Sequence, residues 1–219
     1  MITTVIFDMD GLLFSTEPVY FECYKKAAAD RGLTFTFELF ESCVGISSEE
    51  SNRLIRNYFG EGIDVGDLNR SCYAHFERYL DEGGTIEFRP GAKEAVEYFY
   101  NRGLKIGLAS SNISRWVEYL LNEKGIRNYF SSVLTSDMVS KPKPDPELYL
   151  RTARNLNSDV SECLVFEDSI AGATAAIAAH MRTCVVPQIK QPNSFVKSHA
   201  FKIYQSLEDI YPDMDELLA

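Results

Sequence analysis

Short runs of apolar and β-branched residues alternate with helix-length amphipathic stretches over most of the chain. Each run ends in polar residues, and we predict a β-strand at each of the following ranges: Thr3–Phe7, Leu104–Ala109, Val133–Thr135, Cys163–Phe166 and Arg182–Val186. Strands that alternate with helices are typical of a parallel sheet covered by helices on both faces. The pattern therefore predicts an α/β fold with a parallel-sheet core.

The predicted helices carry recognisable start and stop signals. An apolar stripe from Trp116 to Leu121 predicts a helix that ends at Gly125. The segment 144–146, Pro-Asp-Pro, is typical of a helix start, and Ser206 with Asp209 predicts a capping box for the last helix.

One segment, residues 15–88, breaks the alternation because it contains helix patterns and no convincing strand. It predicts three helices: one from Pro18 to Gly32, one capped by Ser47 or Ser48, and one that ends at Gly83-Gly84. We therefore expect two domains, a core formed by residues 1–14 and 89–219 and an inserted α-helical cap formed by residues 15–88.

Charge and composition exclude several classes of function. The 219 residues include 22 Lys and Arg against 32 Asp and Glu, a formal net charge of −10. Sequence-independent binding to nucleic acid or to an anionic membrane needs a basic surface, so we expect neither partner. No stretch is apolar for long enough to span a bilayer. The five cysteines are scattered, which favours reduced thiols in a cytoplasmic protein.

Unusual polar residues follow four of the predicted strands. Asp8 and Asp10 follow the first strand, Ser110-Ser111-Asn112 follows the second, Lys141 lies in the loop after the third, and Glu167-Asp168 ends the fourth. The carboxyl ends of parallel strands share one edge of a sheet, so all four clusters are expected to converge on one crevice.

Each cluster taken alone has an ordinary structural explanation. An Asp-x-Asp pair can form a turn and a helix cap, and Ser-Ser-Asn before a helix is commonly a cap. A single loop lysine is usually solvated, and an acidic pair at a helix start interacts with the helix dipole. The occurrence of all four at successive strand ends favours a composite active site instead.

The charges of this predicted site indicate its chemistry. Asp8, Asp10, Glu167 and Asp168 would repel one another unless a cation lay among them, and oxygen ligands beside a phosphate favour Mg²⁺. We predict that Asp8 is a nucleophile that forms an aspartyl phosphate, and that Asp10 is the general acid and base. Phosphate-binding groups are expected in Ser110, Ser111, Asn112 and Lys141.

Four sequence motifs resemble those of the haloacid dehalogenase superfamily, especially its β-phosphoglucomutase-like phosphatases: Asp8-Met9-Asp10-Gly11-Leu12-Leu13, Ser110, Lys141-Pro142-Lys143-Pro144-Asp145, and Glu167-Asp168-Ser169-Ile170-Ala171-Gly172. The resemblance implies a Rossmann-like core and Mg²⁺ held by Asp8, the Asp10 backbone carbonyl and Asp168, with Glu167 adjacent. It also implies that the cap closes over the substrate and excludes water.

Three residues depart from the pattern of this branch. Ser15 replaces an aspartate, Ser140 replaces the glycine before Lys141, and His180 replaces a glycine at the end of a core helix. A residue with a Cβ at that helix end is expected to cost about 1 kcal/mol.

Several related activities compete with phosphate-ester hydrolysis. A phosphohexose mutase resembles the chain throughout, but it needs a cationic cap residue for a second phosphate. Residues 38–50 contain no lysine or arginine, and Tyr20 replaces a histidine typical of those mutases. The candidate substrate residues of the cap are Tyr20, Gly45, Ser47 and Ser48.

A phosphonatase, a dehalogenase and an inactive binding module are each disfavoured by particular residues. A phosphonatase would need a lysine in the same cap loop, and a dehalogenase would need neither Asp10 nor the acidic pair. A catalytically inactive module that binds a phosphometabolite would not need both a nucleophile and an acid. The sequence thus favours a Mg²⁺-dependent phosphatase, expected to be monomeric, that acts on a small phosphorylated metabolite such as a sugar phosphate, a sugar-acid phosphate or a nucleotide-like monophosphate.

Overall fold

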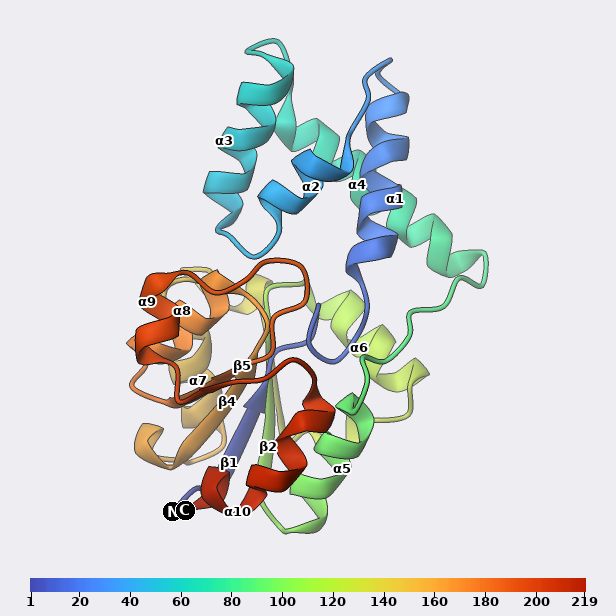
Figure 1. Cartoon of the computed structure of the whole chain (residues 1–219). Helices are drawn as coiled ribbons and strands as arrows, with labels where there is room; N and C mark the ends of the chain where they lie inside the picture. The colour runs from blue at the N-terminus through green and yellow to red at the C-terminus, as the bar shows by residue number, and fades with distance from the viewer. The chain divides into compact units, whose positions relative to one another are not determined.

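The computed structural model describes all 219 residues and divides the chain into two compact units (Figure 1). The first unit comprises residues 1–14 and 88–219, and the second comprises residues 15–87. The insert begins at residue 15, as expected from the sequence, and ends at residue 87, one residue before the expected end. No helix in either unit has the length and apolar character needed to cross a membrane.

The first unit is built on a six-stranded parallel sheet in the order β3-β2-β1-β4-β5-β6. The strands are β1 (Thr4–Phe7), β2 (Lys105–Ser110), β3 (Ser132–Thr135), β4 (Cys163–Glu167), β5 (Arg182–Val185) and β6 (Lys202–Ile203). The predicted α/β fold with a parallel sheet is confirmed, and the five predicted strands are present with ends within one residue. The two-residue strand β6 was not predicted because it is too short to produce a pattern.

Helices cover both faces of this sheet. They are α5 (Ala92–Asn101), α6 (Ser114–Glu123), α7 (Glu147–Asn155), α8 (Ile170–Ala178), α9 (Ser194–His199) and α10 (Met214–Leu218). Ile6 of β1 belongs to the core cluster formed with α7 and α8, whereas the ring of the next residue, Phe7, lies 6.1 Å from that of Phe99 in α5. Successive side chains of a strand point to opposite faces, so both faces are buried.

Two predicted local features are present at helix ends of the first unit. Ser206 and Asp209 form the predicted capping box, which opens the 3₁₀ segment η4 (Leu207–Asp213) ahead of α10. His180, which follows α8, adopts the left-handed conformation with φ of 59°. The Met181 N–H then donates to the Ala176 carbonyl at 3.2 Å, which satisfies a carbonyl at the helix end.

The second unit is entirely helical, with four helices where the sequence predicted three. They are α1 (Glu17–Ala29), α2 (Phe37–Cys43), α3 (Ser48–Phe59) and α4 (Val65–Asp81). Ser47 caps α3 by accepting a hydrogen bond from the Glu50 N–H at 3.2 Å, as predicted. The helix missed by the sequence analysis is α2, which has seven residues and is capped by Thr36. Two turns are too few to establish a helical period.

The insert leaves and rejoins the first unit at neighbouring positions. Phe14 and Phe88 form an antiparallel bridge, and their ring centroids lie 5.1 Å apart. The Arg89 N–H donates to the Leu13 carbonyl at 2.8 Å. These contacts tie the two ends of the insertion together within the first unit.

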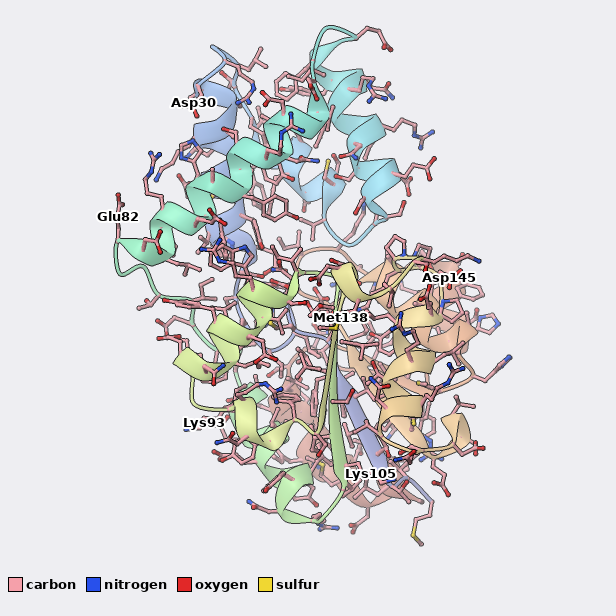
Figure 2. The ribbon with its side chains drawn as sticks, turned by 180° about the vertical axis from the view of Figure 1, so that it is seen from behind. Asp30, Glu82, Lys93, Lys105, Met138 and Asp145 are labelled. Carbon is pink, nitrogen blue, oxygen red and sulfur yellow. The ribbon has the colours of Figure 1, made fainter.

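The carboxyl ends of the strands define the edge of the sheet at which the predicted site residues lie. Figure 2 labels Lys105 at the start of β2 and Met138 beyond the end of β3. Lys105 thus marks the side of the sheet where the strands begin, and Met138 marks the side where they end. Asp145, also labelled there, lies at the same edge as Met138. The polar residues that follow β1, β2 and β4 belong to this edge.

Candidate active site

The position of Asp8 is fixed by the backbone pairing of the strands at the centre of the sheet. It follows β1, which pairs with β2 on one side and β4 on the other, and its N–H donates to the Phe166 carbonyl at 3.0 Å. Asp8 is buried, and its Oδ1 accepts a hydrogen bond from Lys143 Nζ at 2.6 Å. The carboxylate is therefore held in place by backbone pairing and by one buried cation.

Lys143, and not Lys141, is the lysine that the structure brings to this site. The Lys143 ammonium donates to Asp8 Oδ1 at 2.6 Å, to Glu167 Oε1 at 2.6 Å and to the Ala109 carbonyl at 2.9 Å. Its side chain is 4% exposed, whereas that of Lys141 is 72% exposed. The predicted location of Lys141 at the site is wrong.

The loop before α7 turns Lys141 outward. The Glu147 carboxylate accepts hydrogen bonds from the N–H groups of Ser140 and Lys141, the latter at 2.9 Å. The Lys141 ammonium lies 3.7 Å from Asp145 Oδ2. Because the buried lysine stands two positions later, the residue before it is Pro142, and the departure noted at Ser140 does not concern the site.

Glu167, at the end of β4, is fully buried and surrounded by donors. One carboxylate oxygen accepts from Lys143 Nζ at 2.6 Å and from Tyr149 Oη at 2.7 Å. The other accepts from the N–H groups of Asp168 and Ser169 and from Ser169 Oγ, each at 3.0 Å. These hydrogen bonds fix the orientation of Glu167 and compensate the burial of its charge.

Gly172 makes room for this carboxylate. A Cβ atom at position 172 would lie 1.7 Å from Glu167 Oε1, far inside contact distance. Ser169 caps α8 by accepting a hydrogen bond from the Gly172 N–H at 2.9 Å. The small-residue start of α8 therefore has a steric function that the sequence pattern did not reveal.

Asp8, Glu167 and Asp168 form an acidic cluster suited to a cation. One carboxylate oxygen from each residue lies within 4.8 Å of the others, and all three residues are buried. Hard divalent cations such as Mg²⁺ take oxygen ligands of this type. The donor set therefore fits a metal ion, and the Asp10 side chain is not part of the cluster.

The electrostatics of the cluster favour additional positive charge. Burial raises the pKa of the Asp8 carboxyl well above its ordinary value, an effect that Lys143 opposes and Glu167 reinforces. Burial alone would lower the pKa of Lys143, but the carboxylates of Asp8 and Glu167 raise it above its ordinary value. A further positive charge beside Asp8 would favour its ionised form.

Asp10 contacts the loop after β2. Ser110 Oγ donates to Asp10 Oδ2 at 3.2 Å, and Asn112 Nδ2 donates to Asp10 Oδ1 at 3.3 Å. Ser110 and Asn112 are buried, whereas Ser111 is exposed. The structure thus brings together two residues of the predicted phosphate-binding segment with the predicted general acid.

The four candidate cap residues belong to the second unit. Tyr20 stacks on Phe76 with ring centroids 4.6 Å apart, Gly45 has φ of 74°, Ser47 caps α3 and Ser48 is its first residue. The contacts of Tyr20 are those of a packed aromatic ring. A substrate role for these four residues stays a prediction.

Sequence reasoning missed two residues of the first unit. Lys143 occurs in a second Lys-Pro-x-Pro pattern, which overlaps the first by two residues, so the signal was present in the sequence. Tyr149 is fully buried, and its hydroxyl reaches Glu167. Its position on the apolar stripe of α7 resembles that of an ordinary core residue, so no sequence signal distinguished it.

Comparison with known proteins shows which family the chain resembles. The profile of a family described as haloacid dehalogenase-like hydrolase matches residues 5–186. The phosphorylated carbohydrates phosphatase of Thermotoga maritima is 33% identical over 177 residues, which cover 80% of each protein. The β-phosphoglucomutase of Bacillus subtilis is 29% identical over 182 residues, covering 81% of this chain and 80% of that protein.

A solved structure supports the fold. The crystal structure of β-phosphoglucomutase from Clostridium difficile aligns with a TM-score of 0.80 over 100% of this chain and 97% of that one. The two sequences are 24% identical.

Proposed function

The chain belongs to the haloacid dehalogenase-like hydrolase family, and from this premise we propose that it is a phosphatase. Its substrate in this proposal is a monoester of a small phosphorylated metabolite. During hydrolysis, Asp8 carries the phosphoryl group. The observation that carries the proposal is the buried Lys143 ammonium between Asp8 and Glu167, at the sheet edge where Ser110 and Asn112 hold Asp10.

We propose Mg²⁺ as the cofactor. The carboxylates of Asp8 and Asp168 and the backbone carbonyl of Asp10 would hold the ion, with Glu167 beside them. Because Glu167 already accepts hydrogen bonds on both oxygens, its main contribution is to orient Lys143 and the start of α8. When bound, the ion neutralises negative charge on the phosphoryl group and on the carboxylates.

In the first half-reaction, an Asp8 carboxylate oxygen attacks phosphorus as the ester P–O bond breaks. The electron pair of that bond goes to the leaving oxygen, which takes a proton from Asp10. The positive charge of Lys143 and a hydrogen bond from Ser110 both stabilise the phosphoryl oxygens, and so reduce their repulsion of the attacking carboxylate. The product of this step is an alcohol, and the phosphoryl group is now on Asp8.

In the second half-reaction, water attacks the phosphorus of this aspartyl phosphate. Asp10, now ionised, takes a proton from the water, and the Asp8–phosphorus bond breaks to release inorganic phosphate. Asp8 and Asp10 return to their starting states, so the two half-reactions together consume one ester and one water. We propose that the inserted helical unit determines which ester is accepted.

A phosphosugar mutase is the second candidate function, favoured by the 29% identity with β-phosphoglucomutase. Such an enzyme must bind two phosphates, and residues 38–50 lack a basic side chain. The next basic residue is Arg53, whose guanidinium lies 3.6 Å from a Glu50 carboxylate oxygen and is 67% exposed. A nearby carboxylate weakens the attraction of Arg53 for an anion, so hydrolysis is favoured.

Measurement of phosphate release from a panel of phosphate monoesters tests this proposal. We expect turnover that depends on Mg²⁺ and is absent in Asp8→Asn. Turnover that persists in Asp8→Asn or in excess chelator would contradict the proposed mechanism. Conversion of β-glucose 1-phosphate to glucose 6-phosphate faster than phosphate release would favour the mutase. A cytoplasmic location and a monomeric state stay predictions, and sedimentation measurements can test the latter.

A further inference from the structure

The orientation of the Asn112 side chain is determined by its neighbours. Asn112 Oδ1 accepts a hydrogen bond from the Ile113 N–H at 2.9 Å. A backbone N–H can only donate, so the atom it meets must be the amide oxygen, and the amide nitrogen must occupy the other position. That nitrogen lies 3.3 Å and 3.5 Å from the two carboxylate oxygens of Asp10. Asn112 therefore presents a donor to Asp10.

The backbone of Asn112 is anchored independently of any substrate. Its N–H donates to Ser110 Oγ at 3.0 Å, and its carbonyl accepts from both the N–H and the Oγ of Ser136, each at 3.0 Å. Ser136 opens the short segment η2 (Ser136–Met138) after β3. Asn112 is buried, so these contacts are shielded from water. Two neighbouring strand ends thus fix its position.

Ser110 cannot perform the same task throughout the reaction. Its hydroxyl carries one hydrogen, which here points to Asp10 Oδ2 at 3.2 Å. When Ser110 donates that hydrogen to a phosphoryl oxygen, as the proposed mechanism requires, it cannot also donate it to Asp10. The Asn112 amide has no such competing role in the mechanism.

We propose that Asn112 is a positioning residue that holds Asp10 against the leaving oxygen of the ester, and that it is not a phosphate ligand as the sequence suggested. The inference rests on the proposed function. In the step concerned, the ester P–O bond breaks, the leaving oxygen keeps the electron pair, and the Asp10 proton moves to that oxygen while the Asp8–phosphorus bond forms.

The need for this proton depends on the leaving group. An alkoxide is a strong base and leaves slowly unless it is protonated as the bond breaks. Dinitrophenolate is a weak base and leaves without a proton. Misplacement of Asp10 therefore slows the transfer of phosphate from an alkyl ester far more than transfer from dinitrophenyl phosphate.

The test compares kcat/KM of wild type and Asn112→Ala on dinitrophenyl phosphate and on an alkyl phosphate that the wild type hydrolyses. This ratio reports the first phosphoryl transfer, before water attacks. We expect a decrease of about 30-fold or more for the alkyl ester and of less than about 3-fold for the aryl ester, since general acid catalysis contributes about 10²–10⁴-fold. Inhibition by inorganic phosphate should be unchanged. Asn122→Ala, an exposed asparagine of α6, is the matched control.

A decrease that is equal for the two esters, a parallel loss of phosphate inhibition, or no decrease at all would overturn the inference. If circular dichroism shows that Asn112→Ala does not fold, the decision passes to Asn112→Asp, which keeps an oxygen for the Ile113 N–H and exchanges the donor for a negatively charged oxygen. The added charge acts on both esters, so the alkyl ester must lose more activity than the aryl ester. A wild-type protein that hydrolyses neither ester would refute the proposed function itself, and the inference with it.

Discussion

The Nζ atom of Lys143 lies 2.6 Å from Oε1 of Glu167, and both side chains are almost fully excluded from solvent. The same ammonium lies 2.6 Å from Asp8 Oδ1. One cation thus faces two carboxylates in a medium of low dielectric constant, where removal of the cation leaves two negative charges without a compensating positive charge. Lys143 is expected to be essential for both the integrity and the activity of the site.

Lys143→Met should lower kcat/KM by about 10²-fold or more, because it removes a charge that stabilises the phosphoryl group. It should also lower the free energy of unfolding by about 3–5 kcal/mol, since two buried carboxylates lose their partner. Steady-state kinetics and chemical denaturation measure the two effects.

Lys141→Met is the matched control for this change. The Lys141 side chain is exposed, and its ion pair with Asp145 is of the surface type that contributes about 0–1 kcal/mol. We expect wild-type kinetics within about 2-fold. The reverse result, in which Lys141→Met is inactive and Lys143→Met is active, would contradict the assignment.

The sequence alone could not determine which of the two lysines, Lys141 or Lys143, enters the site. Residues 141–144 and 143–146 are both Lys-Pro-x-Pro, so either lysine satisfies the pattern. The choice depends on where α7 begins and on the Glu147 side chain, which binds the N–H groups of Ser140 and Lys141. Pattern alone cannot supply such a contact.

The strands and the site edge could be predicted because they depend on local signals. Most residues of β1, β2 and β4 are apolar and buried, and the polar residues that follow these strands mark the site edge. By contrast, the donor that Asn112 presents to Asp10 depends on a local hydrogen bond from the Ile113 N–H and on a tertiary contact with Ser136. A loop sequence does not reveal which way an amide points.

Asp8→Asn should abolish turnover and yet stabilise the protein when chelator removes divalent cations. The pKa of Asp8 is raised mainly by burial, so the folded protein disfavours its ionised form. The uncharged asparagine avoids this cost. We expect an increase in Tm at neutral pH of at least about 2–4 °C, which corresponds to about 1 kcal/mol. Thermal denaturation with chelator present measures it.

The way in which the Tm difference between Asp8→Asn and wild type changes with pH provides the control. The folded protein binds the Asp8 proton more tightly than the unfolded chain, whose aspartate pKa is about 3.9. The contribution of protonated Asp8 to stability is therefore present at low pH and is lost as pH rises through the raised pKa. The Tm advantage of Asp8→Asn should shrink as pH falls toward 4, about the unfolded value. An advantage that grows on acidification would show that burial does not dominate.

Gly172→Ala should lower the activity of the site, although Gly172 has no side chain that could bind a metal ion or a substrate. The added methyl group would lie 1.7 Å from Glu167 Oε1, so the carboxylate must move away from Lys143. We expect destabilisation of about 1–3 kcal/mol and a loss of kcat that exceeds any change in KM. Gly62→Ala, where a Cβ meets nothing within 4 Å, should behave like wild type. Equal behaviour of the two variants would argue against this steric role.

Addition of Mg²⁺ to chelator-treated protein should raise Tm, because the ion binds the folded cluster and not the unfolded chain. Asp168→Asn should remove most of this increase, since it replaces one of three clustered carboxylates. Asp137→Asn is the control, because the Asp137 carboxylate binds the Ser114 N–H at 3.0 Å and lies outside the cluster. If Mg²⁺ raised the Tm of Asp168→Asn as much as that of wild type, the ion would bind outside this cluster.

The bridge between Phe14 and Phe88 brings the two ends of the inserted segment together. Because the two ends of the insertion already meet within the first unit, a short turn can join them in place of residues 15–87 without stretching the sheet. The helical segment can then be exchanged for one of a different size while the catalytic machinery keeps its own connections. Since we propose that the helical unit selects the ester, we expect recombination at this junction to change the substrate preference.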